Sequence, residues 1–64
     1  MKGQWTVFYG CDEWQETECF HSKEEAENWL FSRSRKDLTY GAHPATFAFV
    51  RDENDNIVGE REDL

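Results

Sequence analysis

The sequence predicts an α+β fold: a small antiparallel sheet, with elements in the order β-β-α-β-β along the chain, and one helix packed on one face of the sheet. Two segments rich in aromatic and β-branched residues precede a capped amphipathic segment, and two further segments follow it. A length of 64 residues allows a single small acidic domain, residues 1–64. Five Phe, three Trp and two Tyr are expected to supply much of the core.

The first two strands are expected at residues 4–9 and 14–20, joined as a hairpin by a turn at residues 10–13. The run Gln-Trp-Thr-Val-Phe-Tyr has the composition of a strand. Gly10 permits the positive φ angle that a tight turn requires. A hairpin therefore opens the fold.

Side chains alternate between the two faces along each strand, so each face of the hairpin can be assigned. Glu16 and Glu18 lie in the middle of one face of the second strand, which we expect to be solvated. Thr17 and Cys19 are then expected to face the core, while Phe8 joins the solvated face. The core face of the first strand is expected to carry Trp5, Val7 and Tyr9.

The helix is expected to begin at Lys23 and to run to about Lys36. Ser22, followed three residues later by Glu25, fits a capping box. Acidic residues near the predicted start and basic residues near the predicted end agree with the helix macrodipole. The expected buried stripe consists of Ala26, Trp29 and Leu30.

The second half of the chain is expected to return as two strands. Residues 37–45 contain Gly41 and Pro44, which break regular structure and predict a connecting loop. Residues 46–51 read as the third strand, and the Asn- and Asp-rich residues 52–56 read as a turn. The fourth strand is expected from Ile57 to about Glu62, and the last residues, Glu62, Asp63 and Leu64, are expected to fray.

A single helix covers only one face of such a sheet, so the opposite face is left open. Apolar residues interleaved with carboxylates on an exposed face are typical of an interaction site. The open face is expected to carry Phe8, Trp14, Phe20, Val50 and Val58 together with Glu16, Glu18, Glu60 and Glu62. The candidate partner-binding residues are Phe8, Asp12, Glu13, Trp14, Glu16, Glu18, Glu60 and Glu62.

The formal charge of −7 points to the kind of partner. Direct nucleic-acid binding and anionic membranes are disfavoured, because both need Lys and Arg to neutralise phosphates. A protein with a basic surface is the favoured partner, and a second copy of the chain, bound through the open face, is the alternative. The acidity can also serve solubility alone.

The two cysteines bear on the compartment. Cys11 and Cys19 are expected too far apart to form a disulfide, because the second strand separates them. Reduced thiols indicate a cytoplasmic protein.

No pattern in the chain predicts catalysis, a metal site or a cofactor. The same-face carboxylate pairs have no cleft to desolvate them. Cys11, Cys19, His21 and His43 lack the spacing of a zinc site. The Asp- and Asn-rich turn lacks the glycine that a calcium loop requires at its sixth position. We therefore expect a non-enzymatic protein.

The run Phe-His-Ser-Lys-Glu-Glu-Ala-Glu-Asn-Trp-Leu at residues 20–30 resembles the "F-x-T-K-x-E-A-E-x-W-L" segment of arm-type DNA-binding domains in tyrosine recombinases. The resemblance implies a sheet followed by a helix. In that family the sheet is basic and reads DNA, whereas here no Lys or Arg lies between Lys2 and Lys23. The resemblance implies nucleic-acid binding, with Arg33, Arg35 and Lys36 contacting phosphates, as the alternative function.

In size and acidity the chain also resembles small DNA-mimicking proteins of phages. That resemblance implies an inhibitor or regulator whose carboxylates stand in for the phosphates bound by a basic protein. The leading expectation is therefore a non-enzymatic protein-interaction module, possessing no catalytic residues of its own.

Overall fold

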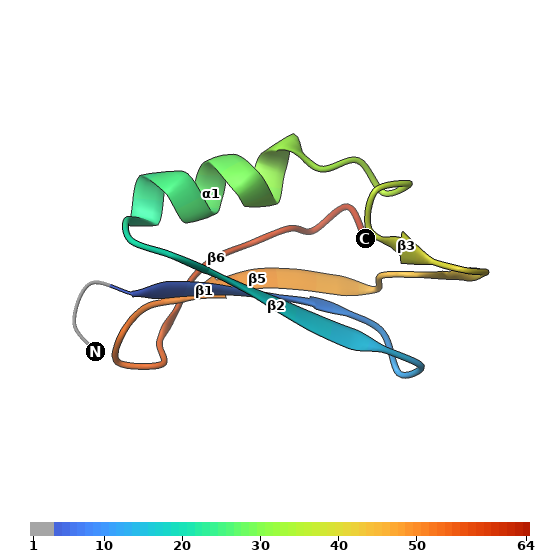
Figure 1. The fold of residues 1–64 in the computed structure, drawn as a ribbon, viewed down its shortest axis with the longest axis horizontal. Helices are drawn as coiled ribbons and strands as arrows, with labels where there is room; N and C mark the ends of the chain where they lie inside the picture. Colours follow the sequence, from blue (N-terminus) through green and yellow to red (C-terminus); the bar gives the residue numbers. More distant parts are fainter. Residues whose placement is uncertain (1–3) are drawn as a thin grey trace.

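A four-stranded antiparallel sheet with a helix lying across one face forms the body of the molecule (Figure 1). The computed structural model describes residues 4–64. The predicted α+β fold is confirmed. The sheet is built from β1 (Trp5–Gly10), β2 (Gln15–Phe20), β5 (Phe47–Arg51) and β6 (Ile57–Glu60), the helix is α1 (Lys23–Ser32), and β3 (Thr39–Tyr40) and β4 (His43–Pro44) form a separate two-stranded hairpin.

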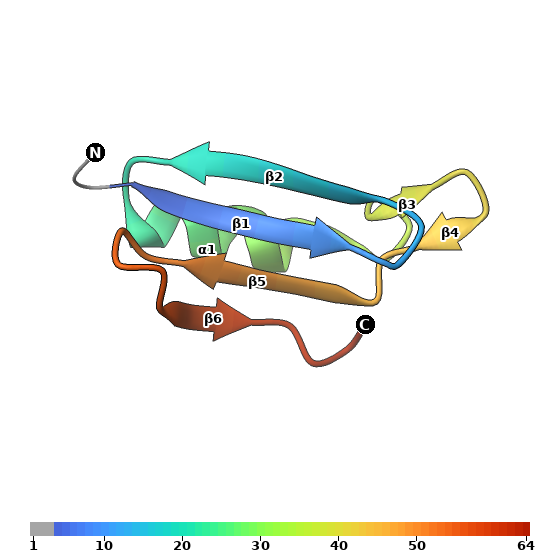
Figure 2. The ribbon, with the colours of Figure 1, turned by 90° about the horizontal axis from the view of Figure 1, so that it is seen from below.

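The strands lie in the order β2-β1-β5-β6, with β1 and β5 in the centre (Figure 2). Two hairpins, β1–β2 and β5–β6, are connected along the chain by α1 and the β3–β4 segment. They join into one sheet through the antiparallel pairing of β1 with β5. The helix lies along the central strands, and β2 and β6 form the two edges of the sheet.

The buried centre of the molecule is aliphatic. Val7 and Val50, which are paired across the two central strands, are fully buried, as are Ala26 and Leu30 of α1. Leu38, in the segment between α1 and β3, is also buried. Aromatic side chains surround this centre and are themselves half-buried, so they do not form the innermost core expected from composition. These surrounding aromatic residues are Trp5, Tyr9, Trp14, Phe20 and Trp29.

The predicted faces of β1 are confirmed, since Val7 is buried and Trp5 and Tyr9 pack on the core, but the predicted faces of β2 are wrong. Tyr9 lies opposite Glu16 and Val7 opposite Glu18, so both carboxylates are on the helix side. The cause is the turn between β1 and β2, which is closed by a hydrogen bond from Cys11 N to Trp14 O at 2.8 Å and leaves two residues in the loop. A loop of this length sets odd-numbered residues of β1 opposite even-numbered residues of β2. The two carboxylates are nevertheless exposed, since they lie on an edge strand.

The same register corrects the predicted positions of Thr17 and Cys19. Thr17 lies opposite Phe8, and Cys19 lies opposite Thr6, on the face away from the helix. Both side chains are exposed rather than turned toward the core. Of the residues predicted on the open face, Phe8 lies where expected, and so does Glu60, opposite Phe49.

Four apolar residues expected on the open face lie on the helix side instead. Val50 is fully buried there, and Val58 packs against the core from the irregular step between β5 and β6. Phe20 lies opposite Trp5 and close to Trp29, with 6.1 Å between the Phe20 and Trp29 ring centroids. Trp14 packs edge-on against Tyr9. Each therefore extends the core.

The start of α1 agrees with the predicted cap, and its end does not. Ser22 Oγ accepts a hydrogen bond from Glu25 N at 3.1 Å, which satisfies an amide of the first turn. The helix ends at Ser32, because Arg33 has extended backbone angles. Ser34 and Asp37 then exchange two side chain–backbone hydrogen bonds that hold a separate turn. The helix is therefore shorter than predicted.

A single arginine from the C-terminal segment caps the end of α1. Arg61 Nη1 donates to the carbonyl oxygens of Leu30, at 3.1 Å, and of Arg33. Its Nε and Nη2 donate to the two carboxylate oxygens of Asp63 at 3.0 and 2.6 Å. The positive charge lies at the negative end of the helix dipole. Although β6 ends at Glu60 rather than Glu62, the last residues are held in place and Leu64 packs on the core.

The turn predicted at residues 52–56 is confirmed. Asp52 Oδ1 accepts hydrogen bonds from Asn54 N at 2.8 Å and Asn56 N at 2.9 Å. These bonds, led by the one from Asn56, lower the pKa of the Asp52 carboxyl. Asp55 takes a positive φ angle of 66°, which Asn and Asp tolerate better than most residues.

Replacing Leu30 with Ala is expected to lower the free energy of unfolding by about 2–5 kcal/mol, because a fully buried side chain leaves a cavity at the centre of the core. Chemical denaturation checks this. The neighbouring Phe31, which is 58% exposed, is the control, and Phe31→Ala is expected to change stability by less than about 0.5 kcal/mol. Equal losses in the two variants would contradict the described helix orientation.

The Asp63 carboxylate is expected to stabilise the fold only while it is ionised. Its hydrogen bonds with Arg61 lower the pKa of Asp63, so this stabilisation is present above the ordinary Asp pKa of about 3.9 and is lost as pH falls through the lowered value. Asp63→Asn is therefore expected to be less stable than the wild type at neutral pH, with the difference closing in acid. Glu62→Gln serves as the control, and a deficit independent of pH would refute the assignment.

Candidate binding surfaces

An outer strand and its turn form the first candidate surface. We define the acidic edge as Asp12, Glu13, Glu16 and Glu18, which are all exposed. None of these carboxylates forms an ion pair with another residue among residues 4–64. The pKa of Tyr9 is raised, first by burial and then by the charges of Glu18 and Glu16, which agrees with both carboxylates lying on the helix side of β2.

The backbone of β2 has hydrogen-bonding groups free along its outer side. Because the Cys11–Trp14 pair is hydrogen-bonded, strict antiparallel alternation makes Tyr9–Glu16 and Val7–Glu18 the next such pairs. The N–H and C=O groups of the intervening β2 residues then point away from β1. These intervening residues are Gln15, Thr17 and Cys19.

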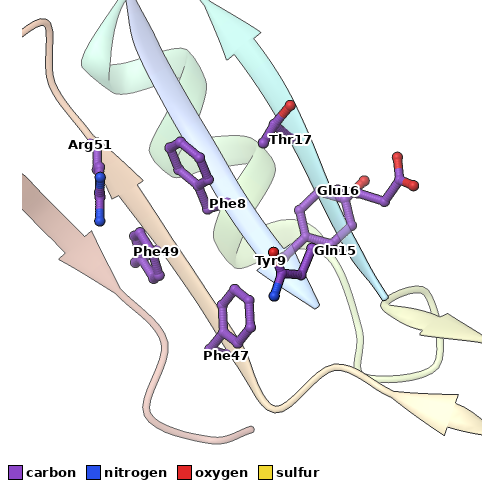
Figure 3. A pocket seen from close by; sticks show the side chains of 8 residues that line it. All are labelled: Phe8, Tyr9, Gln15, Glu16, Thr17, Phe47, Phe49 and Arg51. Atoms are coloured by element: carbon purple, nitrogen blue, oxygen red, sulfur yellow. The ribbon is translucent and has the colours of Figure 1, made fainter. Parts of the chain in front are cut away.

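The second candidate surface is on the opposite side of the sheet. We define the aromatic face as Phe8, Phe47, Phe49 and Arg51, contributed by the two central strands (Figure 3). The Phe8 and Phe49 rings stack with centroids 5.6 Å apart and an interplanar angle of 19°. Phe47 continues the row, with its ring centroid 5.7 Å from that of Phe49. The result is a row of three half-buried rings.

A depression of about 580 Å³ overlies this row of rings. Gln15 and Thr17 of β2 also line it, and both are exposed. Tyr9 and Glu16 border it as well, although the register turns their side chains toward the helix side. The depression therefore combines the rings of Phe8, Phe47 and Phe49 with polar side chains from β2.

Arg51 lies at one end of the aromatic row. Its guanidinium carbon is 5.2 Å from the centroid of Phe8 and 5.4 Å from that of Phe49, which are cation–π distances. Its Nε is closed off from solvent and has no hydrogen-bond partner among residues 4–64. A cation without an anionic partner therefore borders an apolar depression.

The structure separates the predicted partner-binding residues into several groups. Phe8 belongs to the aromatic face, and Glu60 lies on the same side, opposite Phe49. Glu62 lies beyond β6. Trp14 is removed from the predicted surface, since it packs on the core side and its Nε1 donates to His43 O at 2.7 Å. The remaining four are the acidic edge: Asp12, Glu13, Glu16 and Glu18.

Sequence reasoning missed three residues of the aromatic face. It placed Phe47 and Phe49 on one face of their strand correctly, but the pairing that brings Phe49 opposite Phe8 is between distant segments. Arg51 was not singled out, although its position two residues after Phe49 puts it on the same strand face. That spacing was the available signal.

No catalytic or metal-binding arrangement was identified in the part of the chain that the structure describes. There, no three His, Cys, Asp or Glu side chains are grouped closely enough to hold a metal ion. No helix among residues 4–64 has the length and apolar character needed to cross a membrane. Models of known protein families, characterised proteins and solved structures give no match to the chain.

The two cysteines are expected to react at very different rates. Cys19 is exposed near one end of the hairpin, whereas Cys11 is buried at the other. A thiol-specific reagent is therefore expected to modify one thiol rapidly and the second only after unfolding, because modification needs access to the thiolate. Cys19→Ser should abolish the rapid phase. A rapid phase that persists in Cys19→Ser would show that Cys11 is accessible.

Proposed function

We propose that the protein is a non-enzymatic interaction module whose acidic edge binds an extended, basic segment of another protein. The observation that carries this proposal is that β2, an exposed edge strand, combines outward backbone groups with carboxylates on one of its faces. Edge strands with free N–H and C=O groups are templates for an added strand.

The geometry of an added antiparallel strand explains the basic character of the partner. Gln15, Thr17 and Cys19 would form the hydrogen-bonded pairs, because their backbone groups point outward. Glu16 and Glu18 would then occupy the positions between them, where opposite side chains approach most closely. Lys or Arg at alternate positions of the added strand would thus pair with the two carboxylates.

The same geometry disfavours pairing between two copies of β2. In an antiparallel pair centred on Thr17, Glu16 of one copy would lie opposite Glu18 of the other. Like charges placed directly opposite each other destabilise a sheet. The carboxylates therefore protect the edge against self-association while leaving it open to a basic segment.

The overall charge supports the same class of partner. A charge of −7 attracts basic surfaces and raises the rate of encounter. Basic segments are common in nucleic-acid-binding proteins, where they neutralise phosphates. We infer that such a protein is the target, and that binding of this module inhibits or regulates it.

The alternative, direct nucleic-acid binding by the sheet, is less well supported by the positions of the cations. Among residues 4–64, Arg51 is the one Lys or Arg on the open face of the sheet. The neighbouring Glu60 is acidic, and the acidic edge would repel a phosphate backbone. Titration with single- and double-stranded DNA at low salt tests this alternative.

The proposal is tested with a synthetic peptide that alternates Lys and Val, titrated by calorimetry. Replacing Glu16 and Glu18 together with Gln is expected to weaken binding by about 0.4–2 kcal/mol, since each cross-strand charge pair contributes about 0.2–1 kcal/mol. The salt dependence of binding should fall as well. Glu60→Gln with Glu62→Gln removes the same charge from the far edge and is expected to bind like the wild type.

Strand addition is tested separately by changing the peptide alone. Two peptides are compared, one methylated at the backbone nitrogens of its odd-numbered residues and the other at those of its even-numbered residues. In an added strand only one of these two sets of N–H groups faces β2, so one methylated peptide should lose binding and the other should keep it. Equal binding of both methylated peptides would mean that charge attraction operates without strand addition. If the Glu16→Gln, Glu18→Gln variant and the Glu60→Gln, Glu62→Gln variant weakened peptide binding equally, the assignment of the site to β2 would be wrong.

A further inference from the structure

The aromatic face offers an apolar surface that the helix does not cover. Phe8, Phe47 and Phe49 form a continuous row, with small angles of 19° and 30° between successive ring planes. They lie on the side of the sheet that the helix does not cover (Figure 3). Aromatic rings arranged in this way present area on which a planar apolar group can stack.

Charge determines which planar group would be bound. The Arg51 guanidinium lies at the end of the row and has no ion pair or hydrogen bond with another residue among residues 4–64. Glu60, which lies on the same side opposite Phe49, does not pair with it. Because its Nε is closed off from solvent, an anion would reach the terminal nitrogens. A carboxylate matches their planar arrangement.

We propose that the aromatic face binds a small aromatic carboxylate, with its ring system stacked on Phe8 and Phe49 and its carboxylate at Arg51. The depression of about 580 Å³ has the size of a small-molecule site. Arg51 is the one cation in its lining and lies beside Phe8 and Phe49, while the acidic residue Glu16 borders the depression from β2. The Arg51 end is therefore complementary to a single negative charge on a flat apolar body. The register turns the side chains of Glu16 and Glu18, the two β2 residues of the acidic edge, toward the helix side of the sheet, although Glu16 also borders the depression.

Two other occupants are less complementary to this surface. A nucleic-acid strand carries a charge at every phosphate, whereas the face supplies one arginine and lies beside Glu60. A second copy of the chain would place Arg51 against another uncharged aromatic row, unless the copies were offset toward Glu60. A ligand with a single negative charge pairs with Arg51 and needs neither further cations nor an offset between two copies.

The test uses naphthoate and its uncharged counterpart, naphthylmethanol, titrated into the wild-type protein. Two-dimensional proton–nitrogen spectra report the site, and the amides of Phe8, Phe49 and Arg51 and the Arg51 Nε–H are expected to shift. Naphthoate is expected to bind about tenfold more tightly than naphthylmethanol, as a charge-assisted hydrogen bond implies. This comparison needs no variant and so does not depend on the folding of a mutant.

Two arginine variants locate the charge. Arg51→Met is expected to remove the preference for naphthoate while still binding the rings weakly. Arg33→Met is the matched control, because Arg33 lies 4.8 Å from the Trp29 ring centroid on the helix side; it should keep the preference.

Several results would overturn the proposal. Equal affinity for the charged and uncharged ligands would remove the role of Arg51, and shifts centred on Trp29 would place binding on the helix side. Concentration-dependent dimerisation that shifts the Phe8 and Phe49 amide signals without added ligand would identify the face as an interface between copies. Binding of single-stranded DNA at the same amides, without binding of naphthoate, would identify a nucleic-acid surface.

Discussion

The packing of α1 against the two central strands is the contact on which the other features depend. Leu30 and Ala26 are fully buried against Val7 and Val50, and they hold the helix along the middle of the sheet. A helix in this position leaves one sheet face and the outer side of β2 in solvent. Arg61 completes the arrangement, because it links the end of the helix to the C-terminal segment. Both candidate surfaces are consequences of this packing.

The turn between β1 and β2 determines that Glu16 and Glu18 lie on one side of the sheet and the aromatic face on the other. Since it sets Glu16 opposite Tyr9 and Thr17 opposite Phe8, the carboxylates lie on the helix side and the aromatic row keeps neutral neighbours on β2. One strand can therefore present a charged edge on the helix side and neutral side chains on the side of the rings. The structure thus replaces a single mixed surface, expected from sequence, with two surfaces of different chemistry.

Local signals in the sequence were reliable where a few adjacent residues determine the outcome. The Ser22 cap and the Asp52 turn depend on hydrogen bonds between near neighbours, and both form as expected. The helix end was less predictable, because Arg33 and the residues after it have ordinary helical propensity. The position of the helix end is set by the Ser34–Asp37 turn and by the distant Arg61. A longer helix would break the hydrogen bonds that these residues form.

Sequence by itself determined the class of fold, the order of the helix and the four sheet strands, the acidity and the presence of an uncovered sheet face, but not the short β3–β4 hairpin, which lies where a connecting loop was expected. Only the tertiary structure decided which residues lie on that face, because polarity alone assigned Glu16 to it. An edge strand can solvate carboxylates on either face, so their polarity does not report which face is buried. The meeting of Phe8, Phe49 and Arg51 likewise required the pairing of β1 with β5, two segments far apart in the chain.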